Sequence, residues 1–242
     1  MGGTGHRLTI GAAVAVVVLA GCGSPESEAR GGSSAAPSPT SSPAYLYSCV
    51  NTPFDPARLE GPGGLEKEDS ELGQALRDLM ETPDGDFLKK AQEWRVVVED
   101  GDRVEAVGRA PGKHGYMHAI FERSGDSWKP AGWGDCKPHV VVGGRSPATW
   151  ELVEEPSPDD TELVVDATER ACASGRQLEE HQVRADVAYG EEAITIVVSA
   201  DPLPGGECPE NPPVRLTVPL DEPVGDRILL DAAVFPPARR YP

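Results

Sequence analysis

Five cysteines, at positions 22, 49, 136, 172 and 208, are the residues whose type and spacing most clearly indicate chemistry. None belongs to a Cys-x-x-Cys pair, so the sequence gives little support to a thiolate metal site. The first cysteine follows an apolar segment near the start of the sequence. The other four are spread over the part that predicts folded structure. Two kinds of cysteine chemistry are therefore expected.

Residues 1–21 have the composition of an export signal. Leu8–Ala20 follows Arg7 and is mostly apolar, but it is shorter than the roughly 20 residues that a membrane-spanning helix needs. The segment ends in Leu19-Ala20-Gly21-Cys22, which resembles the bacterial lipobox, where small residues fit the signal peptidase and the thiol accepts lipid. The resemblance implies a diacylglycerol on Cys22 and anchoring to the outer face of the cell membrane. An ordinary signal peptide is the alternative.

Residues 22–44 predict a disordered tether after the signal. Ser, Pro, Ala, Gly and Glu dominate this segment, and no large apolar side chain follows Cys22 within it. Such a composition cannot bury a core. The tether would hold a folded part away from the lipid headgroups.

The four remaining cysteines predict two disulfides, because an exported chain meets an oxidising compartment. Four cysteines allow three pairings. We predict Cys49–Cys136 and Cys172–Cys208, since each bridge then closes one half of the chain.

Histidine is scarce and does not form a recognisable ligand pattern. His114 and His118 have the spacing of two ligands on a helix, but the nearby proline and glycines argue against a helix there. On a strand these two side chains would lie roughly 13 Å apart, too far to share a metal ion. His139 or His181 could complete a site only through the fold. No nucleophile elbow, HExxH, phosphate loop or EF-hand loop occurs. The sequence predicts no catalytic residue, metal or cofactor.

Acidic clusters allow a second interpretation. Residues 99–102, Glu-Asp-Gly-Asp, predict a hairpin turn rather than a weak calcium site, and residues 154–162 predict an acidic loop. Glycoside hydrolysis would need two carboxylates about 5–9 Å apart in a cleft. Sequence alone does not show such a cleft.

Three tryptophans could form a binding surface. If Trp94, Trp128 and Trp133 were exposed together, they would offer a stacking surface for a sugar or a peptide. The favoured interpretation is that Trp94 and Trp128 fill a small core while Trp133 packs beside a disulfide.

The charge balance excludes one class of partner. The sequence has 40 acidic against 22 basic residues, a net charge of −18, which would repel nucleic acid. Most of this charge falls in residues 148–242, with 20 acidic residues, seven arginines and no lysine.

The elements that must position these residues differ between two predicted domains. In residues 45–147, Leu72, Leu76, Leu79 and Met80 recur at helical spacing up to Pro83. Alternating segments then predict strands near 94–98, 103–108 and 116–123, followed by a turn into Trp128. One helix over a small antiparallel sheet is the simplest arrangement.

Residues 148–242 predict a second, β-rich domain. Alternating or apolar segments predict strands at 150–153, 162–167, 183–189, 194–198, 214–220 and 228–230. This regular spacing is typical of an antiparallel sandwich or a half-open barrel. The predicted fold class is therefore α+β, dominated by β-structure.

Several cysteine and turn segments together resemble a known group of proteins. They are Gly132–Cys136, Glu169–Gly175, Cys208–Pro212 and Glu222–Asp231. With the lipobox, they resemble uncharacterised secreted lipoproteins of actinobacteria over most of residues 85–237. The resemblance implies a location and carries no known activity.

The sequence therefore predicts a lipid-anchored extracytoplasmic binding or interaction protein without catalysis. Its partners would be the membrane, through Cys22, and a protein or glycan of the envelope. The alternative is an envelope hydrolase that acts on glycan or peptide through paired carboxylates.

Overall fold

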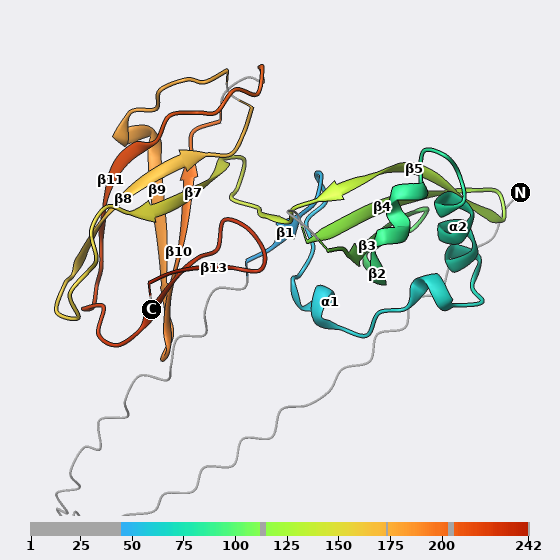
Figure 1. Cartoon of the computed structure of the whole chain (residues 1–242), viewed down its shortest axis with the longest axis horizontal. Helices are drawn as coiled ribbons and strands as arrows, with labels where there is room; N and C mark the ends of the chain where they lie inside the picture. Colours follow the sequence, from blue (N-terminus) through green and yellow to red (C-terminus); the bar gives the residue numbers. More distant parts are fainter. Residues whose placement is uncertain (1–44, 112–114, 173, 203–205, 242) are drawn as a thin grey trace, which may run out of the picture. The chain divides into compact units, whose positions relative to one another are not determined.

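Strands are the main regular secondary structure of the described part of the chain (Figure 1). The computed structural model describes residues 45–111, 115–172, 174–202 and 206–241. Within these ranges no helix has the length and apolar character needed to cross a membrane. The described structure is α+β and dominated by β, as the sequence predicted.

Helix α2 (Glu71–Met80) forms where the leucine spacing predicted it. Ser70 caps its start, because the Ser70 hydroxyl accepts a hydrogen bond from the backbone N–H of Gly73 at 3.1 Å. Leu76 and Leu79 are buried and belong to the core cluster that the helix shares with the neighbouring sheet. Short helical segments lie on either side of α2. In the described residues before the four-stranded sheet, they are α1 (Ala57–Glu60), Leu65–Lys67 and Asp86–Lys90.

A four-stranded antiparallel sheet follows the helix in the sequence. Its order is β2 (Gln92–Asp100), β3 (Arg103–Arg109), β4 (Tyr116–Ser124) and β5 (Ser127–Cys136). Gly101 and Gly125 have φ values of 56° and 62° in the two tight turns, a conformation that glycine adopts without strain. Residues 99–102 therefore lie at a hairpin turn, as predicted.

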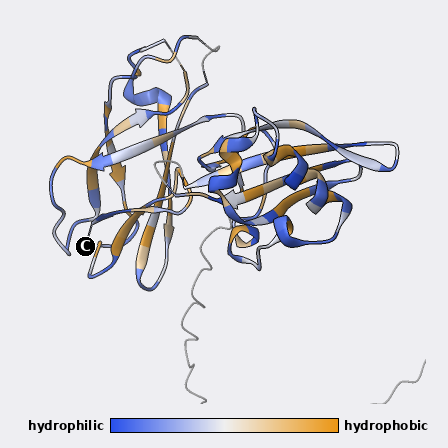
Figure 2. Cartoon of the chain, turned by 45° about the vertical axis from the view of Figure 1, so that its right-hand side comes forward, coloured by the Kyte–Doolittle hydropathy of each residue, from blue (hydrophilic) through white to orange (hydrophobic). Residues whose placement is uncertain are grey.

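Core clusters lie on both faces of this sheet. Trp94, Ala119 and Phe121 lie in the cluster on the α2 face. Val97, Val107 and other residues join a second cluster with β1 (Tyr47–Ser48), α1 and β6 (His139–Val140). Figure 2 shows hydrophobic positions alternating with hydrophilic ones along these strands. The aliphatic and aromatic side chains of these strands are thus divided between the two core clusters.

The remaining strands form a second, larger sheet. They are β7 (Ser146–Leu152), β8 (Glu162–Glu169), β9 (Val183–Tyr189), β10 (Ala193–Ala200), β11 (Val214–Pro219), β12 (Ile228–Asp231) and β13 (Ala238–Tyr241). The six predicted strands are present, and β13 is an addition that the sequence pattern did not reveal.

Strand β10 is the centre of this sheet. It pairs with β9 along one edge, from Ile194 to Ala200. Its other edge pairs first with β12, over Ala193–Ile196, and then with β7, over Val198–Ala200. The pairing of β10 with β12 is parallel, so the expectation of a purely antiparallel domain is wrong at this strand. A parallel pair needs a crossover connection, and β11 lies between β10 and β12 in the sequence.

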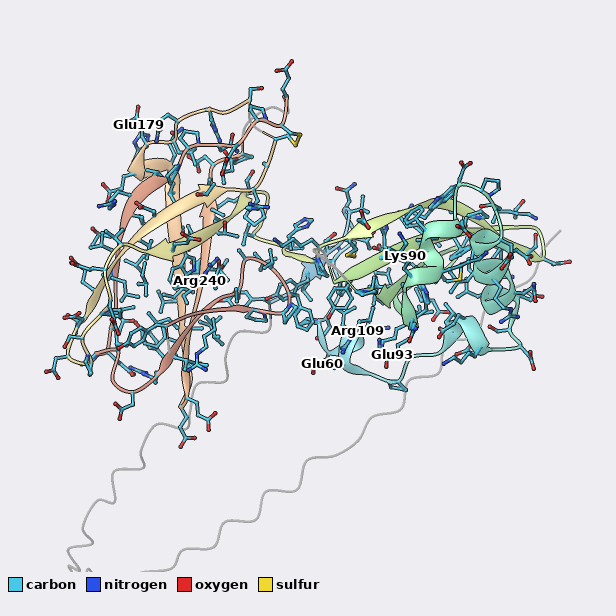
Figure 3. All side chains as sticks on the ribbon, in the orientation of Figure 1. Glu60, Lys90, Glu93, Arg109, Glu179 and Arg240 are labelled. Atoms are coloured by element: carbon cyan, nitrogen blue, oxygen red, sulfur yellow. A yellow bond between two sulfur atoms is a disulfide. The ribbon has the colours of Figure 1, made fainter. Side chains whose placement is uncertain are left out.

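A buried aspartate holds the last strand in place. Asp231 is fully buried and accepts hydrogen bonds from the backbone N–H groups of Trp150 and Ala233. Arg240 of β13 donates to the same carboxylate at 2.7 Å (Figure 3). This charge-assisted contact explains a strand whose sequence, Ala-Arg-Arg-Tyr, has no alternating pattern.

Both predicted disulfides are present. Cys49 is bonded to Cys136, and Cys172 is bonded to Cys208. The cluster that joins Val97 and Val107 to β1, α1 and β6 contains residues from each half of the sequence, including Val140 and Val197. The predicted domain boundary at residue 147 stays a prediction.

We expect the two disulfides to contribute unequally to stability. The Cys49–Cys136 bridge spans 87 residues and Cys136 is buried, whereas Cys172–Cys208 spans 36 residues with both cysteines exposed. Replacing Cys49 and Cys136 by serine should lower the free energy of unfolding by about 4–5 kcal/mol, and the Cys172/Cys208 double variant should lose less. Urea unfolding of the two double variants measures this, and an equal or reversed order would contradict it.

Candidate functional site

A groove crosses the α2 face of the four-stranded sheet, beyond the start of the helix. Its volume is about 540 Å³. We call it the transverse groove, and its lining residues are Pro62, Gly63, Gly64, Leu65, Glu68, Ser70, Glu71, Leu72, Trp94, Arg95, Val96, Glu99, Val104, Arg123 and Trp128. All four strands contribute, so the groove runs across the sheet rather than along one strand.

The floor of the transverse groove is apolar. Val104 is buried, whereas Leu72, Val96 and Trp128 are only half-buried and pack against the edge of the core. Half-buried apolar side chains in a hollow leave surface that another molecule can cover. The start of α2 supplies Leu72, β2 supplies Val96, and the β4–β5 hairpin brings in Trp128.

An irregularity in β2 places a carboxylate at this groove. The register with β3 shifts between Val96 and Val98, so Glu99 lies opposite Val104, on the α2 face. Regular alternation from Trp94 and Val96 would have placed Val98 on the α2 face. Val98 instead packs against the cluster on the other face. A bulge of this kind redirects side chains, and here it puts a carboxylate at the rim of the groove.

A glycine-rich loop forms another wall of the groove, and hydrogen bonds hold this loop against β2. The Glu66 carboxylate accepts from the backbone N–H groups of Glu93 and Trp94 at 3.3 and 3.1 Å. Arg95 donates to the carbonyl oxygens of Gly61 and Glu93. A Cβ on Gly63 would lie 2.6 Å from the Glu93 carbonyl oxygen, so only glycine permits this approach.

Glu93, at the start of this wall, has an unusual backbone conformation. Its φ is 55°, in the left-handed region. The Glu93 carboxylate contacts Arg95 at 3.2 Å and Arg109 at 4.0 Å, and the labels of Glu93 and Arg109 lie close together in Figure 3. These contacts hold the first register shift of β2 in place.

Arg123 forms one end of the groove. Its guanidinium carbon lies 4.4 Å from the centre of the Trp128 ring, a cation–π distance. Its Nη1 is 4.0 Å from the Glu71 carboxylate. Arg123 therefore covers the outer side of Trp128 and links the hairpin to the first turn of α2.

The three tryptophans do not form a joint exposed surface. Trp94 is fully buried, and its ring lies over Gly108, where an added Cβ would be 2.5 Å from the indole. Trp133 pairs with Ala119 on the α2 face, and its Nε1 donates to the Asp84 carbonyl oxygen. The expectation that Trp133 packs beside the disulfide is wrong, because Cys136 belongs to the cluster on the opposite face.

The histidines are placed apart. His118 lies on β4 beside Glu105 of β3, with 4.0 Å between Nδ1 and Oε1. Burial lowers the pKa of His118 and that of His139 in β6, whereas His181 is exposed and contacts Glu179. His114 lies outside the described residues. In the ranges that the structure describes, no group of three acidic, histidine or cysteine side chains is arranged to hold a metal ion.

Glu105 is the most unusual acid of the first sheet. It is only 1% exposed, and neither carboxylate oxygen has a hydrogen-bond partner among the described residues. Burial raises the pKa of Glu105, while the charge of Arg103 opposes this change. A buried carboxyl group without a hydrogen bond carries a desolvation penalty, so the burial of Glu105 indicates a cost in stability.

Two other carboxylates line a hollow in the second sheet. Glu151 and Asp166 face each other across β7 and β8 in a hollow of about 530 Å³ that also includes Glu210. Asp166 accepts two hydrogen bonds from Arg215, and Glu151 lies 3.9 Å from Arg240. Each of the paired acids is therefore matched with an arginine.

The sequence found some groove residues and missed others. Leu72 and Trp128 were recognised as apolar helix and strand positions, but nothing in the sequence joined them to Glu99 or Arg123. The Gly61-Pro62-Gly63-Gly64 run was a visible signal for a closely packed loop. The predicted lipid acceptor Cys22 lies outside the described residues.

Comparison with protein-family models, with curated proteins and with solved structures finds no match for this chain.

Glu105 should make stability depend on pH in a defined direction. The pKa of a buried carboxyl is raised, so the folded protein holds this proton more tightly, and stability is lost as pH rises above the unfolded value of 4.5. The variant Glu105→Gln removes this titration. The melting temperature of the variant minus that of the parent should therefore increase as the pH rises from about 4 to about 8.

The control for this prediction is Glu122→Gln, which changes an exposed glutamate on β4. Thermal unfolding followed by circular dichroism at several pH values gives the comparison. A difference between Glu105→Gln and the parent that stays constant with pH would contradict the prediction.

Proposed function

We propose that this chain is a lipid-anchored extracytoplasmic binding protein whose ligand occupies the transverse groove. The observation that carries the proposal is the groove itself, in which half-buried Leu72, Val96 and Trp128 line a hollow of about 540 Å³. Binding sites commonly combine such an apolar floor with a few polar groups at the rim. Here Glu71, Glu99 and Arg123 would supply the polar groups.

The construction of the groove supports a binding role. Its loop wall is fixed to β2 through Glu66 and Arg95, and its helical wall starts at the capped Ser70. Groups that are already fixed lose little conformational freedom when a ligand binds, so more of the contact energy contributes to affinity.

The location follows from the sequence. The lipobox at Cys22 and the following Ser/Pro/Ala-rich residues 23–44 fit a protein anchored by a diacylglycerol to the outer face of the cell membrane. The resemblance to secreted actinobacterial lipoproteins agrees with this location. The membrane is then one partner, and an envelope component that reaches the groove is the other.

An envelope hydrolase is the second candidate. The opposition of Glu151 and Asp166 in one hollow favours it, because paired carboxylates can act as acid and nucleophile or base. The Arg215 contact and the exposure of the Glu151 side chain, 81%, weigh against it. A catalytic acid normally needs shielding from water, which an exposed side chain lacks.

The anchor is tested by the variant Cys22→Ser. Without the thiol, no diacylglycerol can be attached, and two acyl chains are what gives stable membrane binding. We expect the variant to leave the membrane fraction and to appear in the soluble fraction, measured by fractionation and immunoblotting. Retention of Cys22→Ser in the membrane to the same extent as the parent would overturn the lipid assignment.

The groove is tested by photo-crosslinking in the native membrane. A diazirine analogue of leucine replaces Leu72, in the groove, and in a separate variant Val153, an exposed apolar residue outside it. We expect a discrete adduct only from the groove position, resolved by electrophoresis and mass spectrometry. The absence of an adduct at Leu72, or equal adducts at both positions, would count against the groove as the binding site.

A further inference from the structure

The rim of the transverse groove is rich in carboxylates. Glu68, Glu71 and Glu99 are all exposed, and Glu99 has no ion-pair partner among the described residues. Of the two arginines that line the groove, Arg95 is only 9% exposed and is bonded to the loop wall. Arg123 alone remains as an exposed cation, so the groove presents more negative than positive charge.

The contacts of Arg123 show which chemistry fits this end of the groove. Its guanidinium lies over Trp128 at 4.4 Å and beside Glu71 at 4.0 Å. A cation is therefore stabilised there by a ring face and a carboxylate together. Because Arg123 covers the outer side of the Trp128 ring, this face is not open for a sugar to stack on it. An anion would be repelled by the three glutamates of the rim.

The floor of the groove adds a second requirement. It extends from Val96 on β2 past Val104 on β3 to Trp128 on β5, so it is elongated across the sheet. An isolated ammonium ion would leave Val96 and Leu72 in contact with water. A ligand that covers this floor needs apolar groups on either side of its cation.

We propose that the groove binds an extended protein segment in which a lysine or arginine is flanked by apolar residues. The cation would lie between Glu71 and Glu99, and the apolar neighbours would cover Leu72 and Val96. The negative charge of the whole chain, −18, would favour the approach of such a partner. This inference rests on the proposed function, because it names the ligand class of the same groove.

The test uses the full chain in detergent and three synthetic peptides. Each peptide has a central residue between two leucines, and the centre is lysine, acetyl-lysine or glutamate. Isothermal titration calorimetry measures affinity. We expect the lysine peptide to bind about tenfold more tightly than the acetyl-lysine peptide, because acetylation removes the charge and leaves the apolar flanks. The glutamate peptide should bind most weakly.

Two variants locate the effect. Glu99→Gln should weaken binding of the lysine peptide several-fold. The melting temperature of the protein should not fall, since the Glu99 side chain forms no ion pair with the described residues. Glu122→Gln removes the same charge from the neighbouring hairpin, outside the groove, and should leave binding unchanged. Glu99→Lys should reverse the preference toward the glutamate peptide. Added salt should weaken only the lysine peptide.

The outcomes separate this inference from the proposed function. Equal affinity for the lysine and acetyl-lysine peptides, or equal effects of Glu99→Gln and Glu122→Gln, overturns the cationic ligand. If a crosslinked adduct forms at Leu72 in the membrane while the lysine peptide does not bind, the groove keeps its function and the ligand class is wrong. If the adduct is also absent, both proposals fail.

Discussion

The irregular path of strand β2 is the constraint on which the rest of the first sheet depends. Core clusters lie on both faces of this sheet, so the apolar residues of β2 must suit one core or the other. The first register shift brings Trp94 over Gly108, and the second moves Glu99 to the α2 face. The loop that carries Glu66 binds the strand at the first shift. Core packing and the shape of the groove therefore have a common origin.

The acidic character of residues 148–242 has a structural counterpart in their arginines. Arg176 is largely buried, contacts the buried Glu169 and donates to the Asp201 carbonyl oxygen. Arg240 in the same way donates a hydrogen bond to the carboxylate of the buried Asp231. The planar, multiply donating guanidinium suits such contacts better than an ammonium group, which gives a physical reason for arginine at these positions of a lysine-free segment. The remaining acidic residues are mainly exposed.

Local patterns predicted much of the fold. Helix α2, the two hairpins of the first sheet and six strands of the second follow from spacing and turn residues, because these features depend on neighbours in the sequence. The disulfide pairing was also predicted. The parallel pairing of β10 with β12, the strand β13 and the position of Trp133 were not. Each depends on partners far away in the chain, such as Asp231 for Arg240.

By itself, the sequence determined α2 and most of the strands, the cysteine framework and the charge, and it led to the expectation of a lipid anchor at Cys22. These properties depend on residue types and on short spacings along the chain. Only the tertiary structure decided that Leu72, Glu99 and Trp128 line one groove while Glu105 is buried without a hydrogen bond to any described residue. The physical reason is that one register shift changes the face on which a side chain lies, and pairing between strands, rather than local sequence, sets that register.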